Sequence, residues 1–307
     1  MSRPRLRLGT RASALARWQA QWVADSLKAI GVDVELVPIT TRGDTSQGDA
    51  IGNLGAPGVF TKELQRVLID ERIDLAVHSL KDLPTDVVDG LTLAAVPPRE
   101  SPFDVLLSRH GPFEQLPQGA TVGTGSLRRR AQLLHARADL QMRDIRGNVD
   151  TRVAKLAAGE FDAIVLAEAG LRRLELEHHV TQRFEPTVVL PAVGQGALGI
   201  EVRTGDSSTH ELVERLDDPL SHSAVLAERT LLAALRGGCL APIGAWARVA
   251  ADGRLRLDAA VLSADGKTRL AAGGEDALAA AVALGNRVAA NLLVAGAGPL
   301  IDASRRA

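Results

Sequence analysis

Short apolar runs alternate with segments of helical periodicity along most of this chain, and this alternation limits its possible folds more than any other feature. The runs 6–8 and 34–39 flank a segment in which apolar residues recur at helical spacing, namely Leu15, Trp18, Trp22 and Ile30. Further apolar runs follow at 75–77 and 91–96. Strands that alternate with helices form sheets covered by helices. We therefore predict an α/β protein.

Prolines and a later return of the strand pattern divide this α/β region into two lobes. Pro97 and Pro98 impose extended backbone, because each ring fixes its own φ and disfavours helix in the preceding residue. Strands are expected at 103–107, 121–122, 142–145 and 163–166, and helices near 127–136 and 149–158. Leu190-Pro191 offers a return crossing, after which 197–203 is expected to be a strand that rejoins the first lobe. We predict two lobes with a cleft between them, formed by 1–96 with 197–215 and by 101–190.

The pattern changes from about Asp218 onward. A helix is expected at 224–235, strands at 243–249, 255–262 and 268–272, and one long helix at the end. Asp252-Gly253 and Asp265-Gly266 separate the strands, and Asp-Gly is a strong hairpin signal. We predict a third, small α+β domain over 218–307, with an antiparallel sheet covered by helices.

The overall charge gives no general attraction to polyanions. The formal net charge is −1 at pH 7, so nucleic-acid binding would require a local basic patch, and we expect no nucleic-acid partner. The seven histidines are scattered and there is one cysteine, so no metal-ligand spacing is recognisable and no metal is expected.

The sequence also predicts a cytoplasmic protein without a membrane partner. Arg11, Arg17 and Gln19 interrupt the start of the chain before an apolar run of signal-peptide length forms. The apolar segment 277–297 contains Arg287 and two asparagines, so it is interpreted as a packing helix rather than a membrane span. A single cysteine cannot form an internal disulfide, which suits a reducing compartment.

The strongest local motif is GTGSLRRR, residues 123–130, which follows an apolar strand and opens a helix. Glycines let backbone N–H groups face a ligand, Ser126 is a typical N-cap, and a helix start favours an anion. The motif is either an anion cradle or an ordinary strand–loop–helix connection with solvated arginines. It is not a complete dinucleotide fingerprint.

Similar basic groups follow the next two predicted strands. Arg146 and Arg152 lie in the motif RGNVDTR, and Arg172-Arg173 follows the strand after it. Ligands bind open α/β sheets outside the carboxyl ends of the strands. Convergence of these groups favours a ligand with several carboxylates or phosphates. In the first lobe, Arg11 and Ser13 follow a strand in the same way.

The segment HSLKDLP, residues 78–84, places polar groups directly after a buried strand. Asp82 is either a turn former or a functional carboxylate. Lys81 either binds an acid group or is solvated. His78 is interpreted as a hydrogen-bonded histidine at a strand end rather than as a catalyst.

Cys239 lies in a glycine loop, RGGCLAP, between a predicted helix and strand. A lone cysteine is usually buried and inert. Two preceding glycines and a proline three residues later favour an accessible thiol, on which thiolate chemistry or covalent attachment is possible. Both interpretations remain open.

Six motifs together resemble the porphobilinogen deaminase (hydroxymethylbilane synthase) family. They are HSLKDLPT, GTGSLRRRAQLL, IRGNVDTR, AGLRRL, LPAVGQGALGIE and GGCLAPIG, and the likeness runs in order from about Leu6 to Val249. The resemblance implies a three-domain fold whose first two lobes are similar to periplasmic binding proteins. It also implies a cytoplasmic transferase of tetrapyrrole (haem and chlorophyll) biosynthesis that joins four porphobilinogens head to tail with loss of ammonia.

The resemblance further implies a role for each matching residue. Cys239 would hold a dipyrromethane cofactor through a thioether. Asp82 would be the catalytic carboxylate, which hydrogen-bonds pyrrole N–H groups, assists ammonia departure and stabilises a cationic methylenepyrrolenine. The implied cofactor-binding residues are Lys81, Thr124, Ser126, Arg128, Arg129, Arg146 and Gly147. The implied substrate-binding residues are Arg11, Ser13, Phe60, Arg146, Arg152 and Arg173.

This sequence departs from the family pattern at two positions, and one alternative function stays open. Pro57 replaces a common lysine, and Glu168 replaces a small or apolar residue, where it could pair with Arg172 or weaken the anion site. The alternative is a non-catalytic polyanion-binding protein with the same two-lobed cleft. We expect a monomer whose product passes to uroporphyrinogen-III synthase.

Overall fold

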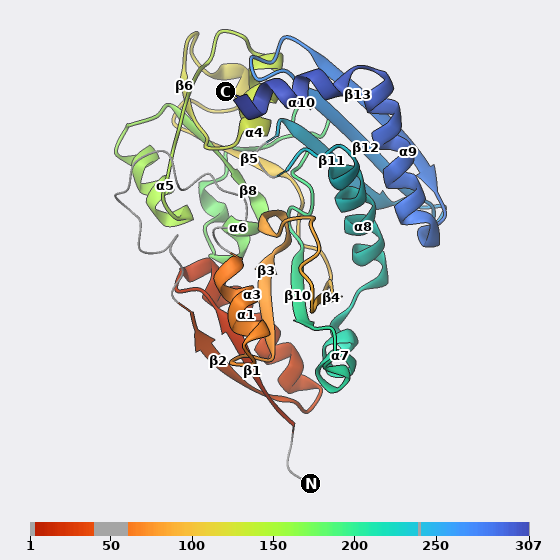
Figure 1. Cartoon of the computed structure of the whole chain (residues 1–307). Coiled ribbons are helices and arrows are strands. Elements are labelled where there is room, and N and C mark those ends of the chain that lie inside the picture. Colours follow the sequence, from red (N-terminus) through yellow and green to blue (C-terminus); the bar gives the residue numbers. More distant parts are fainter. Residues whose placement is uncertain (1–3, 40–60, 239–240, 307) are drawn as a thin grey trace. The chain divides into compact units, whose positions relative to one another are not determined.

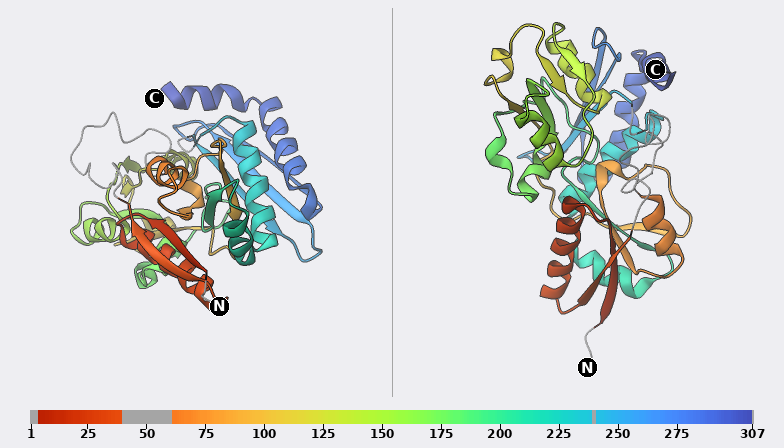
Figure 2. Two further views of the ribbon diagram at one scale, coloured as in Figure 1. Left: turned by 60° about the horizontal axis from the view of Figure 1, so that its bottom comes forward. Right: turned by 90° about the vertical axis from the view of Figure 1, so that its left-hand side faces the viewer.

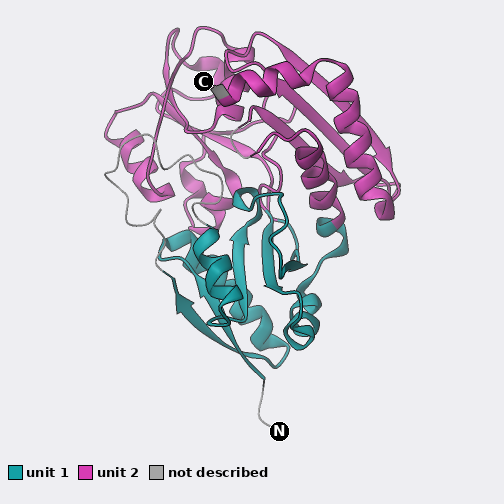
Figure 3. Cartoon of the chain, in the orientation of Figure 1, with its two compact units in different colours: residues 1–99, 197–222 teal, residues 100–196, 223–307 magenta. Residues whose placement is uncertain are grey.

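The computed structural model describes the chain in three stretches, 4–39, 61–238 and 241–306. The chain forms two compact units, shown in different colours in Figure 3. Unit 1 comprises residues 1–99 and 197–222, and unit 2 comprises residues 100–196 and 223–307.

The chain crosses between the units after Arg99, Gly196 and His222. The first crossing directly follows Pro97 and Pro98, where the sequence predicts extended backbone. After the second crossing the chain rejoins unit 1, as predicted, as strand β10 (Leu198–Arg203).

Unit 1 is built on a five-stranded sheet, sheet A, in the order β2-β1-β3-β10-β4 (Figure 1). Strand β1 pairs in parallel with β2 and β3, whereas β10 is antiparallel to β3 and β4. The other strands of this sheet are β1 (Arg5–Thr10), β2 (Asp33–Pro38), β3 (Leu75–Ser79) and β4 (Leu91–Ala95).

Helices α1 (Ala14–Ala29) and α3 (Lys62–Ile69) pack on opposite faces of sheet A. Leu75 and Val77 of β3 lie in one apolar cluster with residues of α1, whereas Ala76 lies in another with residues of α3. Successive side chains of a strand point to opposite faces, so both faces are covered. Helix α7 (Ser207–Val213) contributes to the cluster on the α1 face.

Unit 2 contains a second five-stranded sheet, sheet B, in the order β7-β6-β8-β5-β9. Strands β7, β6 and β8 run parallel, and β5 is antiparallel to both of its neighbours. The strands are β5 (Asp104–Ser108), β6 (Thr121–Gly123), β7 (Gln141–Arg143), β8 (Ala163–Ala167) and β9 (Gln182–Arg183).

Three helices cover sheet B. Ala163 and Val165 of β8 pack with Leu133 of α4 (Leu127–Ala136), and the alternate β8 residues pack with α5 (Val149–Ala157) and α6 (Glu168–Arg173). Short 3₁₀ turns lie at Phe113–Gln115, Glu177–His179, Glu214–Leu216 and Leu278–Ala280.

The remainder of unit 2 contains a three-stranded antiparallel sheet, sheet C, in the order β11-β12-β13. Its strands are β11 (Ile243–Val249), β12 (Leu255–Leu262) and β13 (Arg269–Asp276). The two Asp-Gly pairs lie in the hairpin connections, with Gly253 and Gly266 at φ +77° and +75°. The predicted antiparallel sheet is confirmed.

The two faces of sheet C pack against different helices. One face forms a core with α8 (Pro219–Ala234), α9 (Ala281–Val294) and α10 (Ala297–Arg306). On the other face, Ala260 and Leu262 pack with Ala131 of α4. The Nδ1 atom of His135, in the same helix, lies 2.7 Å from the carbonyl oxygen of Gly266. Helix α4 is therefore held between sheets B and C.

The prediction of one long terminal helix was wrong. Helix α9 ends at Val294, Gly296 takes a φ of +99°, and α10 starts at Ala297 (Figure 2). A left-handed glycine ends a helix, as is common at helix C-termini. Within the described part of the chain no single helix is long and apolar enough to cross a membrane; the segments 278–294 and 297–305 pass that test only as a pair bent by 87°.

Candidate active site

The first group of predicted site residues follows strand β1. Ser13 is the N-cap of α1, and its Oγ accepts a hydrogen bond from the backbone N–H of Ala16 at 3.3 Å. Arg11 lies in the connection between β1 and α1, with a half-buried side chain. The capping bond fixes the start of the helix and thereby this connection.

The second group follows strand β3, in the 3₁₀ turn η1 (Leu80–Asp82). The turn is anchored because the Leu80 side chain is buried and its N–H donates to the Ala197 carbonyl at 3.0 Å. Directly before it, Gln19 Nε2 donates to Ser79 Oγ at 2.8 Å. Lys81 is half-buried and Asp82 is exposed. A rigid turn thus presents the Asp82 carboxylate to solvent.

Both groups lie at one edge of sheet A. Strands β1 and β3 are parallel neighbours, so the residues that follow them emerge at the same edge. Arg11 and Ser13 therefore lie at the same edge of sheet A as the turn that contains Asp82.

Three basic connections follow neighbouring strands in sheet B in the same way. Strands β7, β6 and β8 are adjacent and parallel, so their carboxyl ends lie at one edge. The segment after β7 contains Arg146, helix α4 after β6 contains Arg128 to Arg130, and helix α6 after β8 ends with Arg172-Arg173. The strand order and direction on which the predicted convergence of basic groups depends are therefore present in this sheet.

The start of α4 is built as the sequence predicts. Ser126 is the N-cap, and its Oγ accepts from the Arg129 N–H at 3.5 Å. The buried Thr124 accepts from the Ser126 N–H through its Oγ1 at 3.2 Å. The two hydroxyl groups therefore stabilise the turn that opens the helix.

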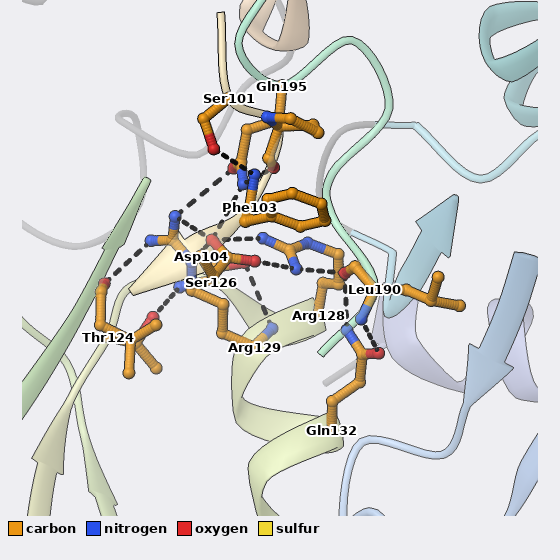
Figure 4. A network of polar contacts seen from close by, with 12 residues as sticks. Ser101, Phe103, Asp104, Thr124, Ser126, Arg128, Arg129, Gln132, Leu190 and Gln195 are labelled. Carbon is orange, nitrogen blue, oxygen red and sulfur yellow. Dashed lines mark hydrogen bonds and ion pairs between the residues drawn. The ribbon is translucent and has the colours of Figure 1, made fainter. Parts of the chain in front are cut away.

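The arginines of α4 surround one buried carboxylate (Figure 4). Arg128 Nη1 donates to Asp104 Oδ2 at 2.7 Å, and Arg129 Nε donates to Asp104 Oδ1 at 2.8 Å. Arg128 Nη1 also donates to the Leu190 carbonyl at 2.6 Å. All three charged side chains are buried, whereas Arg130 is exposed. The solvated-arginine interpretation therefore applies to Arg130 and not to its two neighbours.

The surroundings of this network change its acid–base properties. Burial alone would raise the pKa of Asp104, but the charges of Arg128 and Arg129 outweigh it and hold that pKa well below the usual range. Burial lowers the pKa of Arg128, an effect that the charge of Asp104 opposes. The carboxylate is ionised at neutral pH, and two guanidinium groups share it.

The arginines of the motif after β7 are less buried than Arg128 and Arg129. Arg146 is exposed, and its carbonyl accepts from Lys155 Nζ at 3.2 Å. Gly147 has a φ of +110° and accepts from Arg152 Nε at 2.8 Å. The glycine thus permits a turn that the Arg152 side chain then holds.

The two residues of the last predicted basic pair, Arg172 and Arg173, contact different groups. Arg173 is buried and donates through Nη2 to the Gly196 carbonyl at 2.7 Å. Burial lowers the pKa of Arg173 to about 10, partly offset by the charge of Glu100. Arg172 instead lies 2.6 Å from Glu168 Oε1 and 3.1 Å from Glu100 Oε1. Glu168 therefore pairs with Arg172, one of the two outcomes expected from the sequence.

Three residues of interest lie outside the described residues, namely Pro57, Phe60 and Cys239. The chain just before Cys239 is described. Arg236 and Gly238 have positive φ values of +51° and +63°, and a Cβ at Gly237 would lie 2.2 Å from Ile243 Cδ1. The first glycine of the GGC motif, Gly237, is thus favoured by close packing, and the second, Gly238, by its positive φ.

The sequence interpretation missed the residues that organise the arginines. Asp104 opens a strand whose next three residues are apolar, and a buried charge requires a partner; that signal was present in the sequence. Gln195 Nε2 donates to Asp104 Oδ1 at 3.0 Å, and Gln132 bonds to both the N–H and the carbonyl of Leu190. The partners of these amides could not be identified from sequence.

Replacing Asp104 by asparagine is expected to lower the free energy of unfolding by about 3–5 kcal/mol, because two buried guanidinium groups lose their counter-ion. Denaturant unfolding measures this value. The control is Asp139→Asn, which removes an exposed carboxylate 2.6 Å from Arg137 and should have little effect. Equal effects of the two variants would contradict the proposed importance of the network.

The stability difference between wild type and Asp104→Asn should also depend on pH. The folded pKa of Asp104 lies below its ordinary value of 3.8. Its stabilising contribution is therefore complete above about pH 4 and declines as the pH falls below that value. A difference that stays constant from neutral pH to about pH 2 would contradict the ionised network.

The sequence matches two family models along nearly its whole length. Residues 6–211 match "Porphobilinogen deaminase, dipyromethane cofactor binding domain" and residues 222–294 match "Porphobilinogen deaminase, C-terminal domain".

Curated proteins named porphobilinogen deaminase are similar over the same length. The protein of Desulforudis audaxviator is 50% identical over 297 residues, 96% of each chain. That of Brevibacillus brevis is 47% identical over 300 residues, 96% of each chain. That of Syntrophotalea carbinolica is 46% identical over 306 residues, 99% of this chain and 97% of the relative.

Solved structures with a partial likeness are bacterial periplasmic domains. The BvgS VFT2 domain of Bordetella pertussis is 13% identical with a TM-score of 0.43, over 70% of this chain and 87% of that one. A putative sulfonate-binding protein from Methylobacillus flagellatus is 14% identical with a TM-score of 0.38, over 74% of this chain and 67% of that one.

Proposed function

The chain belongs to the porphobilinogen deaminase family, and we propose that the residues placed above carry out the reaction of that family. It is a transferase of tetrapyrrole biosynthesis with a dipyrromethane cofactor, and it condenses porphobilinogen with release of ammonia. Membership in an enzyme family decides against the non-catalytic polyanion-binding alternative.

The residues around α4 fit a cofactor that carries several carboxylates. One ionised Asp104 faces both Arg128 and Arg129, so this buried group has one positive charge in excess. Arg128 Nε is buried and has no hydrogen-bond partner among the described residues. A buried, uncompensated cation is costly, and a bound carboxylate would offset that cost. When bound, dipyrromethane supplies a covalently held primer for chain growth.

We assign the binding roles by the side chains available. The thioether attachment is proposed at Cys239. The cofactor carboxylates are assigned to Lys81, Thr124, Ser126, Arg128, Arg129, Arg146 and Gly147. The substrate is assigned to Arg11, Ser13, Phe60, Arg146, Arg152 and Arg173. Guanidinium groups suit this task because they bind carboxylates through two parallel hydrogen bonds.

Asp82 is proposed as the catalytic carboxylate. In each condensation a carbon–carbon bond forms at a free pyrrole α-carbon, the carbon–nitrogen bond of the substrate aminomethyl group breaks, and the α-carbon proton is lost. Asp82 would accept hydrogen bonds from pyrrole N–H groups and stabilise positive charge that develops as ammonia leaves. Its place on an anchored turn supports this role, because a fixed carboxylate needs little reorganisation during the reaction.

We propose three domains, with limits at 1–96 and 197–215, at 101–190 and at 218–307. Sheets A, B and C, one in each domain, support this division. We also propose a cytoplasmic monomer that binds no nucleic acid and whose product passes to uroporphyrinogen-III synthase. The near-zero net charge supports the absence of nucleic-acid binding, and the single cysteine supports the cytoplasmic location.

The observation that most supports the anion site is the set of arginines after three parallel strands, and Arg146 tests it. Arg146→Gln should raise the KM for porphobilinogen by about 10- to 100-fold, because a hydrogen bond to a charged group contributes about 1.5–3 kcal/mol. Steady-state assays measure this. The matched control is Arg130→Gln, which removes an exposed arginine of α4 and should leave KM unchanged. An unchanged KM for Arg146→Gln would overturn the assignment of Arg146.

A further inference from the structure

Helix α8 buries a carboxylate that ties two distant segments of unit 2 together. The side chain of Glu228 has no exposed surface. Its Oε2 accepts from the Gly194 N–H at 2.7 Å, and its Oε1 accepts from the Ala247 N–H at 2.7 Å. Hydrogen bonds to an ionised acceptor are about twice as strong as neutral ones. Glu228 therefore fixes the chain at Gly194 relative to strand β11.

The segment that Glu228 holds, Gly194 to Gly196, has a backbone conformation that depends on its two glycines. Gly194 and Gly196 have φ values of +69° and +87°, which side chains with a Cβ rarely adopt. A Cβ at Gly196 would also lie 2.3 Å from the Glu100 carbonyl oxygen. The segment therefore lies close against Glu100, and the bond at Gly194 holds it from the other end.

The next two residues of this segment contact the arginine site directly. Gln195 Nε2 donates to Asp104 Oδ1 at 3.0 Å, and Gln195 Oε1 accepts from Arg129 Nη2 at 3.5 Å, within the network drawn in Figure 4. The Gly196 carbonyl accepts from Arg173 Nη2 at 2.7 Å. One short segment therefore orients guanidinium groups from two helices, α4 and α6.

From these contacts we propose that Glu228 is a positioning residue for the anion site. Its carboxylate holds the Gly194–Gly196 segment in the place where Gln195 and the Gly196 carbonyl orient Arg129 and Arg173. This inference rests on the proposed function, since it assigns those arginines to porphobilinogen and its condensed form.

A purely structural role makes a different prediction. Loss of buried packing away from the arginines should lower thermal stability alone, whereas loss of the Gly194 bond should also change the orientation of Arg129 and Arg173. Glu228→Gln separates the two cases, because glutamine has the same shape but only one acceptor oxygen for the two backbone N–H groups. The stability control is Val288→Ala, which opens a cavity at a fully buried position in the apolar core beside sheet C.

The test uses full-length protein and porphobilinogen as the probe. We expect Glu228→Gln to raise KM and to slow covalent loading of the apo-protein, followed by intact mass, each by roughly tenfold. Val288→Ala should lower the thermal midpoint by at least as much as Glu228→Gln does. It should leave KM and the rate of loading within about twofold of wild type. If Glu228→Gln does not fold, Glu228→Asp, which keeps the charge but shortens its reach, takes its place.

A double-mutant cycle then tests whether Glu228 acts on KM through Gln195. Because part of the effect of Glu228 passes through Gln195, adding Glu228→Gln to Gln195→Ala should raise KM by a smaller factor than adding it to wild type, and the same addition of Val288→Ala should leave the Gln195→Ala value unchanged. Multiplicative effects on KM, or a Glu228 variant that loses stability with unchanged KM and loading, would overturn the inference. A wild-type protein that neither loads nor consumes porphobilinogen would instead overturn the proposed function, and this inference with it.

Discussion

Replacing Cys239 by serine is expected to abolish both the covalent adduct and the turnover of porphobilinogen. A serine hydroxyl is not ionised at neutral pH and is a much weaker nucleophile than a thiolate, so the thioether does not form. Without a tethered primer no chain can grow. Intact mass and a porphobilinogen consumption assay of the same preparation measure the two losses together.

Cys239 is the only cysteine of the chain, so no second thiol can take its place. The glycines before it, Gly237 and Gly238, owe their identity to close packing against Ile243 and to a positive φ, respectively. Serine adds no bulk at position 239 and should leave the packing of Gly237 against Ile243 intact. Unchanged thermal unfolding of the apo-protein would verify this. Full activity of Cys239→Ser would refute the attachment site.

Replacing Asp82 by asparagine should leave the adduct in place but slow turnover by about 10²–10⁴-fold. Asparagine has nearly the same shape, so the turn that contains it should keep its anchors at Leu80 and Ser79. What is lost is the negative charge that stabilises the developing cation. Steady-state kinetics give the rate, and intact mass shows whether bound intermediates accumulate.

The matched control for this variant is Asp86→Asn. Asp86 is an exposed carboxylate close in sequence to Asp82 but outside the 3₁₀ turn. Its replacement changes the net charge by the same amount and should leave the rate within about twofold, as expected for an exposed residue away from the reacting groups. Equal rates for the two variants would reject a catalytic role for Asp82.

Most of the α/β framework could be predicted because strands and helices leave different apolar periods in a sequence. The run 75–77 became β3, and the predicted helix 127–136 became α4 with Ser126 as its cap. The Asp-Gly pairs likewise became hairpin connections. These features depend on residues close together in the chain, which is the information that pattern analysis uses.

The features that could not be predicted depend on contacts between distant segments or on one backbone angle. Arg128 and Arg129 were expected to be solvated or ligand-binding, but Asp104, more than twenty residues earlier, occupies both. The break at Gly296 lies within an apolar, alanine-rich pattern that otherwise continues, so periodicity could not reveal it. The arginine site was thus located from sequence, whereas its internal ion pairing required the structure.

We propose above all that a dipyrromethane attached at Cys239 is the primer held by these arginines. Intact-mass analysis of the purified protein, followed by peptide mapping, tests it most directly. The account predicts a mass above that of the chain by two porphobilinogens less two ammonias, with the whole increment on the peptide that contains Cys239. An active protein with the unmodified mass, or with the increment on another peptide, would contradict it.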